Sequence, residues 1–147
     1  MTILLVDDEP LVIQDIAAEI SWEALGIQHV LLAYNASQAM REFEYHHIDL
    51  VICDVEMPQI NGIQLLTWIK EHSPSTKSII LTCHPLFDYA KEAIRLNCID
   101  YMLKPVDTDA LSDLLRKTVE DFRRNSPLHD QENFWKQCSS GAYSSNT

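Results

Sequence analysis

The sequence has no surplus of basic residues. Its 147 residues include 11 Lys and Arg against 22 Asp and Glu, which gives a formal net charge of −11. Because proteins bind nucleic acids largely through Lys and Arg on the phosphates, this charge argues against a nucleic-acid-binding surface. It suits a protein that handles cations, or one that is kept soluble by self-repulsion.

Long apolar runs and paired cysteines are also missing. The apolar run at the N-terminus ends at Asp7, so it is far shorter than the roughly 20 residues of a membrane span and lacks the basic start of a signal peptide. The cysteines lie far apart, with no CxxC pair, at Cys53, Cys83, Cys98 and Cys138. We interpret them as reduced thiols, with metal or disulfide use as a minor alternative. These absences predict a cytoplasmic protein without a membrane segment.

Five short, mostly apolar runs alternate with stretches of helical spacing. The runs cover residues 3–6, 30–33, 50–53, 78–81 and 99–103, and they are typical of parallel strands that are covered on both faces. Helical spacing is found over residues 11–20, 37–45, 63–72, 88–96 and 109–124, with Leu11 expected on the apolar face of the first helix. The alternation predicts an α/β fold with a doubly wound, five-stranded parallel sheet and five helices.

The helix starts and the domain boundary have signals of their own. Pro10 suits a first helical turn, and Asn35 or Ser37 and Asp107 or Thr108 suit N-caps. The repeating pattern fills residues 1–124, which we take as one domain of common size. The pattern is lost at Ser126-Pro127, so residues 125–147 are predicted to be a linker or disordered tail.

Charged and hydroxyl side chains follow four of the predicted strands. They are Asp7, Asp8, Glu9, Asp54, Thr82 and Lys104. Ligands of an open parallel sheet bind outside the carboxyl ends of its strands, so these groups are expected at one edge. Carboxylates placed together repel unless a cation neutralises them, and an all-oxygen set suits Mg²⁺ or Mn²⁺. Such a cation beside an ordered Asp54 is typical of a phosphoryl-accepting site.

Each of these residues also has a purely structural interpretation. The Asp7-Asp8-Glu9 triplet could cap the helix that begins near Pro10, Thr82 could be an ordinary strand end, and Lys104 a loop lysine. Asp54 is the hardest to explain in this way, because a carboxylate buried without a partner is costly. Their joint occurrence at four strand ends favours a functional site.

The stretches VDDEP, VICDVEMPQING, IILT and DYMLKP, at these spacings, resemble the receiver domain of bacterial two-component response regulators. The resemblance covers nearly all of residues 2–124. It implies the flavodoxin-like (CheY-like) sheet of strand order 2-1-3-4-5 with five helices. The stretches SWEALGI and LTCHPLFDYAKEAIRL are most similar to the subfamily whose regulators carry an AraC-type DNA-binding output domain.

This resemblance implies a phosphoacceptor and a metal site. Asp54 would accept the phosphoryl group. Asp7 and Asp8 would hold Mg²⁺, with Asp8 as the more direct ligand and Asp7 working through water. The backbone carbonyl of Glu56 would supply a further ligand oxygen.

It also implies the residues that read out phosphorylation. Thr82 matches the switch hydroxyl and Tyr101 the aromatic switch position. Lys104 matches the lysine that contacts the phosphoryl group, and it is followed by a cis-proline, Pro105.

Two positions depart from the family's pattern. Cys83 stands where the family usually has Ala or Gly, so it either narrows access to the phosphoryl group or changes little. The Glu56 side chain either alters the dephosphorylation rate or is a solvated surface carboxylate.

The implied function is a signalling switch with slow self-hydrolysis, not a turnover enzyme. A sensor histidine kinase would donate a phosphoryl group to Asp54. The face formed by the fourth helix, fifth strand and fifth helix would then change to control the chain's own output domain, and it could form a homodimer. Only some 20 residues follow the receiver pattern, so DNA would be bound only through an output domain outside this chain. Either the chain is a fragment of a longer regulator, or it is a stand-alone receiver that acts by protein contact.

Three rival classes fit the sequence less well. A flavodoxin needs a Ser/Thr/Gly-rich phosphate loop after the first strand, where this chain has the acidic DDEP. An aspartyl phosphatase or phosphomutase would have a DxD pattern there, whereas Asp7 is followed two residues later by Glu9. A P-loop nucleotidase is excluded because GxxxxGK[ST] does not occur.

Overall fold

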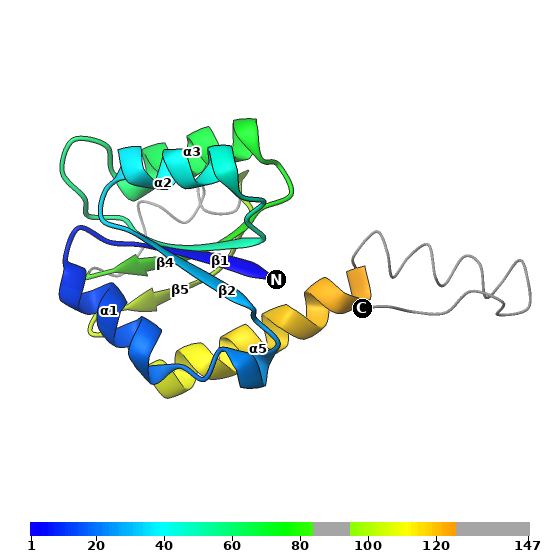
Figure 1. The fold of residues 1–147 in the computed structure, drawn as a ribbon. Helices are drawn as coiled ribbons and strands as arrows, with labels where there is room; N and C mark the ends of the chain where they lie inside the picture. The colour runs from blue at the N-terminus through cyan, green and yellow to red at the C-terminus, as the bar shows by residue number, and fades with distance from the viewer. Residues whose placement is uncertain (84–94, 126–147) are drawn as a thin grey trace, which may run out of the picture.

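The computed structural model describes residues 1–83 and 95–125. Within these residues lie five strands, four α-helices and one 3₁₀ helix (Figure 1). The strands are β1 (Thr2–Val6), β2 (His29–Ala33), β3 (Leu50–Asp54), β4 (Lys77–Thr82) and β5 (Cys98–Leu103). The helices are α1 (Pro10–Glu19), η1 (Glu23–Leu25), α2 (Ala36–Tyr45), α3 (Gly62–His72) and α5 (Thr108–Asn125).

All five strands are parallel and form one sheet of order β2-β1-β3-β4-β5. This is the expected order, so the CheY-like flavodoxin fold is confirmed. The helix expected over residues 88–96 falls mainly on residues that lie outside the described part of the chain. The other four expected helices are α1, α2, α3 and α5.

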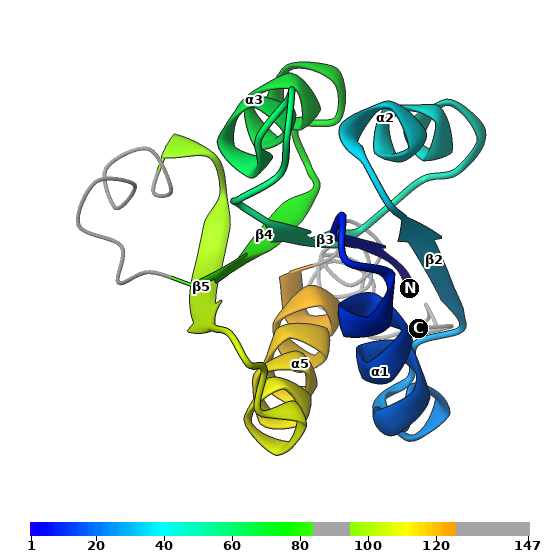
Figure 2. The same ribbon diagram turned by 90° about the vertical axis from the view of Figure 1, so that its left-hand side faces the viewer.

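Two apolar layers hold the sheet between the helices. Successive strand residues point to opposite faces, so Leu4, Val51 and Ile80 pack with α2 and α3, whereas Ile3, Ile52 and Ile79 pack with α1 and α5. Figure 2 shows the two helix pairs on opposite sides of the sheet. Covering helices on both faces explain why the central strands are apolar without alternation.

Two details differ from the sequence-based expectation. Leu11 is 72% exposed, because Ile13, Ile16 and Ile20 form the buried stripe of α1 and Leu11 lies off that stripe. Strand β5 lies at the edge of the sheet, and Tyr101 and Leu103 are each 48% exposed. The prediction of cover on both faces is therefore right for β1, β3 and β4 and wrong for β5.

The helix starts use side-chain caps in most cases. Asn35 accepts a hydrogen bond from the Gln38 backbone N–H, and Asp107 accepts from the backbone of the first turn of α5. At α3, Asn61 and Gln64 form a reciprocal capping box. Within the described part of the chain, no helix is both long and apolar enough to cross a bilayer.

Candidate functional site

Three acids meet at the carboxyl edge of the sheet. Strands β1 and β3 are neighbours, with Val6 opposite Cys53, so the residues that follow them emerge side by side. One carboxylate oxygen from each of Asp7, Asp8 and Asp54 lies within 4.8 Å of the others. Asp7 is fully buried and Asp54 is 1% exposed. The acids that the sequence placed at two separate strand ends therefore form one cluster.

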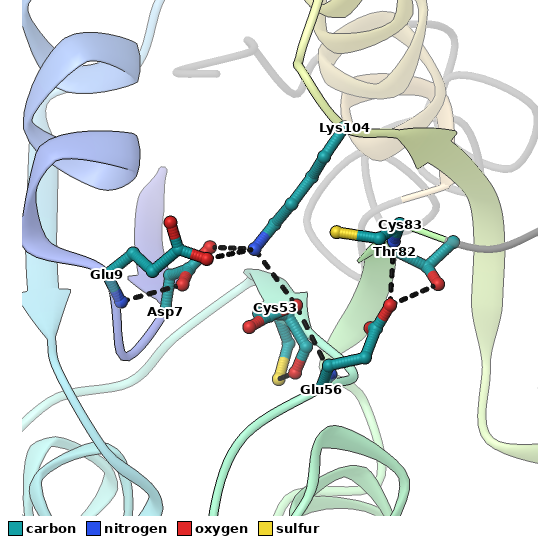
Figure 3. Close-up of polar contacts among 8 residues, drawn as sticks. Asp7, Glu9, Cys53, Glu56, Thr82, Cys83 and Lys104 are labelled. Carbon is teal, nitrogen blue, oxygen red and sulfur yellow. Dashed lines mark hydrogen bonds and ion pairs between the residues drawn. The ribbon is translucent and has the colours of Figure 1, made fainter.

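Lys104 joins this cluster from strand β5. Its Nζ lies 2.8 Å from Asp7 Oδ2, 3.2 Å from Asp54 Oδ1 and 3.8 Å from Glu9 Oε1. Figure 3 shows the lysine reaching across to Asp7 and Glu9. The side chain is only 9% exposed, and the Lys104 backbone N–H donates to the Thr82 carbonyl, which holds the end of β5 against β4. One ammonium thus balances part of the negative charge of three acids.

The crowding of charge shifts the pKa values of the buried groups. Burial, and then the charge of Asp7, raise the pKa of Asp54 to about 7, although Lys104 and the Glu56 backbone N–H work in the opposite direction. For Lys104, burial favours the neutral amine, but the hydrogen bond to Asp7 and the charge of Asp54 outweigh it and raise the lysine pKa. Without a further cation, the site therefore holds more negative charge than Lys104 alone neutralises.

The Asp54 carboxylate has one bound and one free oxygen. Its Oδ1 accepts from the Glu56 backbone N–H at 3.2 Å and faces Lys104. Its Oδ2 is buried and has no hydrogen-bond partner among the described residues. A buried carboxylate oxygen without a donor is costly unless a cation or a reacting group reaches it.

The helix-capping interpretation of Asp7 does not fit the geometry. The N-cap residue of α1 is Glu9, whose side chain makes no capping hydrogen bond. Asp7 Oδ1 instead accepts from the Glu9 backbone N–H at 2.9 Å, which orients the Asp7 carboxylate at the end of β1. Its other oxygen faces Lys104.

Thr82 and Cys83 stand on the far side of Asp54, at the end of β4. Asp54 is in register with Leu81, so Thr82 lies one residue beyond it on the neighbouring strand. The Thr82 hydroxyl donates to Glu56 Oε1 at 2.9 Å, and the Cys83 backbone N–H donates to the same oxygen at 2.7 Å (Figure 3). The Glu56 carboxylate is thus bound inside the site, which contradicts the alternative of a solvated surface carboxylate.

The loop between β3 and α3 holds Glu56 and closes on Asp54. The Gly62 N–H donates to the Val55 carbonyl at 3.0 Å. A Cβ at Gly62 would lie 2.2 Å from the Asp54 carbonyl oxygen, so only glycine permits this approach. The loop from Val55 to Gly62 therefore fixes the backbone conformation next to the Asp54 carboxylate.

The remaining predicted residues lie at the rim. Cys83 is exposed and carries no disulfide. Tyr101 lies on β5 opposite Ile80, with a side chain that is half-exposed. The peptide bond between Lys104 and Pro105 is cis. A groove of about 390 Å³ opens beside Lys104, between α1 and the segment that leads into α5.

The oxygen cluster fits a hard divalent cation. Its donors are carboxylates only, and the buried Asp54 Oδ2 has no other partner within the described residues. Mg²⁺ and Mn²⁺ take such oxygen ligands and keep several waters, for which the more exposed Asp8 leaves room. The contact of the Glu56 side chain with Thr82 was not foreseen. The position of Glu56 next to Asp54, across from Thr82 on the neighbouring strand, is the signal that could have suggested it.

Comparisons with known proteins identify one family. A family model described as "Response regulator receiver domain" matches residues 3–116. The uncharacterized transcriptional regulatory protein YesN of Bacillus subtilis is 33% identical over 122 residues, which cover 83% of this chain and 33% of YesN. The chain thus spans about a third of that relative.

Solved structures of response regulators are similar to this chain in both fold and sequence. The receiver domain of AraT, a response regulator from Geobacillus stearothermophilus, is 31% identical, with a TM-score of 0.76 over 84% of this chain and 95% of that one. A two-component transcriptional regulator AraC from Clostridium phytofermentans is 30% identical, with a TM-score of 0.75 over 82% and 93%.

Proposed function

Because the chain belongs to the response regulator receiver domain family, we propose that it is a phosphorylation-controlled switch whose phosphoacceptor is Asp54. Receiver domains are signalling domains that partner with sensor histidine kinases and with transcription-regulating output domains. The observation that supports Asp54 is its buried Oδ2, which has no hydrogen-bond partner within residues 1–83 and 95–125 and belongs to a carboxylate next to Asp7, Asp8 and Lys104. An oxygen so placed has no donor to stabilise its charge in the described part of the chain, which suits a group that is completed by a cation or a phosphoryl group.

Transfer to Asp54 requires a nucleophile, charge neutralisation and a leaving group. An Asp54 carboxylate oxygen forms the new bond to phosphorus while the bond from phosphorus to the kinase histidine breaks, and the imidazole keeps the electron pair and takes up a proton. Lys104, already 3.2 Å from Asp54 Oδ1, holds the phosphoryl oxygens by charge. Since the pKa of Asp54 is about 7, part of the acceptor is protonated at neutral pH until more positive charge reaches the site.

The proposed metal ligands are Asp7, Asp8, Asp54 and the backbone carbonyl of Glu56. When bound there, Mg²⁺ or Mn²⁺ offsets the charge of the transferring phosphoryl group. The Lys104 ammonium can then contact the phosphoryl oxygens, because it is no longer the only positive charge that neutralises Asp7 and Asp54. We expect a donor to approach by way of the rim groove, which Lys104 and Cys83 line; whether Cys83 narrows this access stays a prediction.

Phosphorylation would change the surface around β5. The new group adds about −1.5 to −2 charges and three acceptor oxygens. We expect the Thr82 hydroxyl to bind it and the half-exposed Tyr101 to turn inward, which alters the face of β5 and α5. That face would control an output domain or form a homodimer, in the cytoplasm. The names of the relatives favour control of transcription, with DNA bound by an output domain; a stand-alone receiver that acts by protein contact is the alternative.

The test is phosphoryl transfer followed by intact mass. The chain is incubated with Mg²⁺ and phosphoramidate or acetyl phosphate, and we expect the mass to rise by one phosphoryl group. Asp54→Ala should gain none, whereas Glu44→Gln, at an exposed acid on α2, should behave as the parent. No gain with several small donors and with a histidine kinase that phosphorylates related receivers would contradict the proposal.

A further inference from the structure

The Glu56 side chain makes the contacts expected of a phosphoryl oxygen. Its Oε1 accepts two hydrogen bonds, from the Thr82 hydroxyl at 2.9 Å and from the Cys83 backbone N–H at 2.7 Å. Both donors lie at the carboxyl end of β4, next to the strand that delivers Asp54. Figure 3 shows the carboxylate directed toward Thr82 and Cys83.

The contact holds a carboxylate without a charged partner in the described part of the chain. Two donors converge on one oxygen, and the other oxygen, Oε2, is buried without a hydrogen-bond partner in the described part of the chain. No ion pair to Glu56 is found within residues 1–83 and 95–125. The Thr82 hydroxyl and the Cys83 backbone N–H thus form a pair of donors that already holds one anionic oxygen.

We propose that Glu56 acts as an internal stand-in for the phosphoryl group: in the resting protein its carboxylate occupies the Thr82 and Cys83 donors, and a phosphoryl group on Asp54 must displace it. The inference rests on the proposed function, because it takes Asp54 as the acceptor. If this displacement is needed, the Glu56 side chain influences the rates of phosphoryl uptake and release.

Two physical effects follow from this occupancy. The carboxylate blocks the two donors, so an incoming phosphoryl group gains their hydrogen bonds only after the Glu56 side chain has turned away. Until then the negative charge of Glu56 repels the donor molecule, which adds to the charge of Asp7, Asp8 and Asp54. The Thr82 hydroxyl is also already engaged by an anion before phosphorylation, so its engagement alone does not distinguish the two states.

A simpler role would be to tie the β3–α3 loop to β4. Glu56→Gln separates the two roles, because the glutamine can keep both hydrogen bonds through its amide oxygen and loses only the charge. Glu56→Ala removes the bonds and the charge together. Glu44→Gln removes one charge from an exposed position on α2 and serves as the control.

The experiment uses the full chain and three measurements. The first is the ¹H–¹⁵N resonance of the Cys83 amide without added metal, which reports the hydrogen bond to Glu56. The second is the affinity for beryllofluoride with Mg²⁺, an anionic phosphoryl analogue. The third is the rate of mass gain with phosphoramidate and Mg²⁺.

If Glu56 stands in for the phosphoryl group, we expect the Cys83 amide resonance to shift in the Glu56→Ala variant. This variant should also bind beryllofluoride about tenfold more tightly and gain the phosphoryl group about tenfold faster. One charge-assisted hydrogen bond corresponds to roughly that factor. Glu56→Gln shows the faster uptake with a smaller change at Cys83. Glu44→Gln matches the parent in all three.

Two results would overturn the inference, and they are distinguishable. If the parent chain is phosphorylated but both Glu56 variants match it in affinity and rate, Glu56 only ties the loop, and Asp54 remains the acceptor. If neither the parent nor any variant gains a phosphoryl group or binds beryllofluoride, the proposed function fails as well.

Discussion

Among single residues, Asp54 makes the stability of the fold depend on pH. Its pKa is about 7 in the folded chain against 3.8 ordinarily, so on raising the pH the unfolded chain loses this proton first. The stabilising effect of the protonated form is therefore complete below about pH 4 and is lost as the pH rises through about 7. Asp54→Asn keeps the shape and removes the charge, and we expect it to be more stable than the parent by about 2–4 kcal/mol at pH 8.

Chemical denaturation at pH 5, 6, 7 and 8, without divalent cations, measures this difference. The gain should shrink toward pH 5, where the folded parent is itself protonated at Asp54. Glu44→Gln, at an exposed position on α2, should show no pH-dependent gain. An Asp54→Asn gain that is equal at pH 5 and pH 8 would mean that the charge on Asp54 is not its source.

Lys104 is the residue on which the buried acids depend. Lys104→Met keeps the aliphatic stem but leaves Asp7 and Asp54 without their cation, and we expect a loss of about 3 kcal/mol at pH 8. At pH 5 the loss should be smaller, because a protonated Asp54 needs no partner. Urea denaturation at the two pH values measures the loss, and Mg²⁺ should recover part of it at pH 8. The control is Lys117→Met on α5, which lies near Asp49 and Lys77 at the amino ends of β3 and β4. An equal loss of stability by Lys104→Met at both pH values would count against the ion-pair explanation.

Most of the site residues could be predicted from sequence, whereas the role of the Glu56 side chain was left open between two alternatives. Asp7, Asp54 and Lys104 follow strands directly, and parallel strands end at the same edge, so their meeting depends on topology alone. The Glu56 side chain reaches Thr82 only because the loop after β3 turns toward β4. Side-chain rotation in a loop has no periodic signature in sequence, which is why two alternatives were open for Glu56.

At the scale of elements, the connection from β3 to α3 is the part with the least freedom. A Cβ on Gly62 would lie 2.2 Å from the Asp54 carbonyl oxygen and 2.8 Å from Val55 Cα, and neither backbone atom is free to move. We expect Gly62→Ala to cost about 2–4 kcal/mol and to slow phosphoryl uptake, because the backbone of Asp54 must shift.

Gly26→Ala provides the comparison. Gly26 has a φ of +82°, and its Cβ would lie 2.7 Å from the end of the flexible Arg123 side chain. The left-handed conformation alone should cost about 1 kcal/mol, with no effect on phosphoryl uptake, since Gly26 lies beside Val119 and Arg123 of α5 and not in the loop after Asp54. Thermal unfolding and the mass assay measure both variants. Equal uptake by Gly62→Ala and the parent would show that the turn does not position Asp54.

The elements themselves were predictable where burial and periodicity agree. The central strands are mostly apolar because helices cover both faces, and their order was expected from the resemblance of the motifs. Leu11 and β5 are the exceptions. Leu11 has an apolar side chain that lies off the buried stripe, and an edge strand such as β5 keeps apolar residues that stay half-exposed; hydrophobicity alone does not distinguish them from core residues.

For the whole molecule, the open question is where the folded unit ends. The family model stops at residue 116, whereas the apolar layer under α1 and α5 extends to Val119, which is 6% exposed. Helix α5 continues to Asn125. The sequence placed the boundary at 124, from the loss of pattern at Ser126-Pro127.

Truncation locates this boundary. A chain of residues 1–125 keeps all the residues that the structure describes in the two apolar layers, so we expect a single cooperative unfolding transition within about 2 °C of the parent and the same phosphoryl uptake. A chain of residues 1–117 loses Val119 and its packing beside η1, and it should be destabilised by about 2–3 kcal/mol. Thermal unfolding by circular dichroism measures both. If residues 1–125 unfold as easily as residues 1–117, the residues after α5 belong to the folded unit, and the boundary inferred from the sequence is wrong.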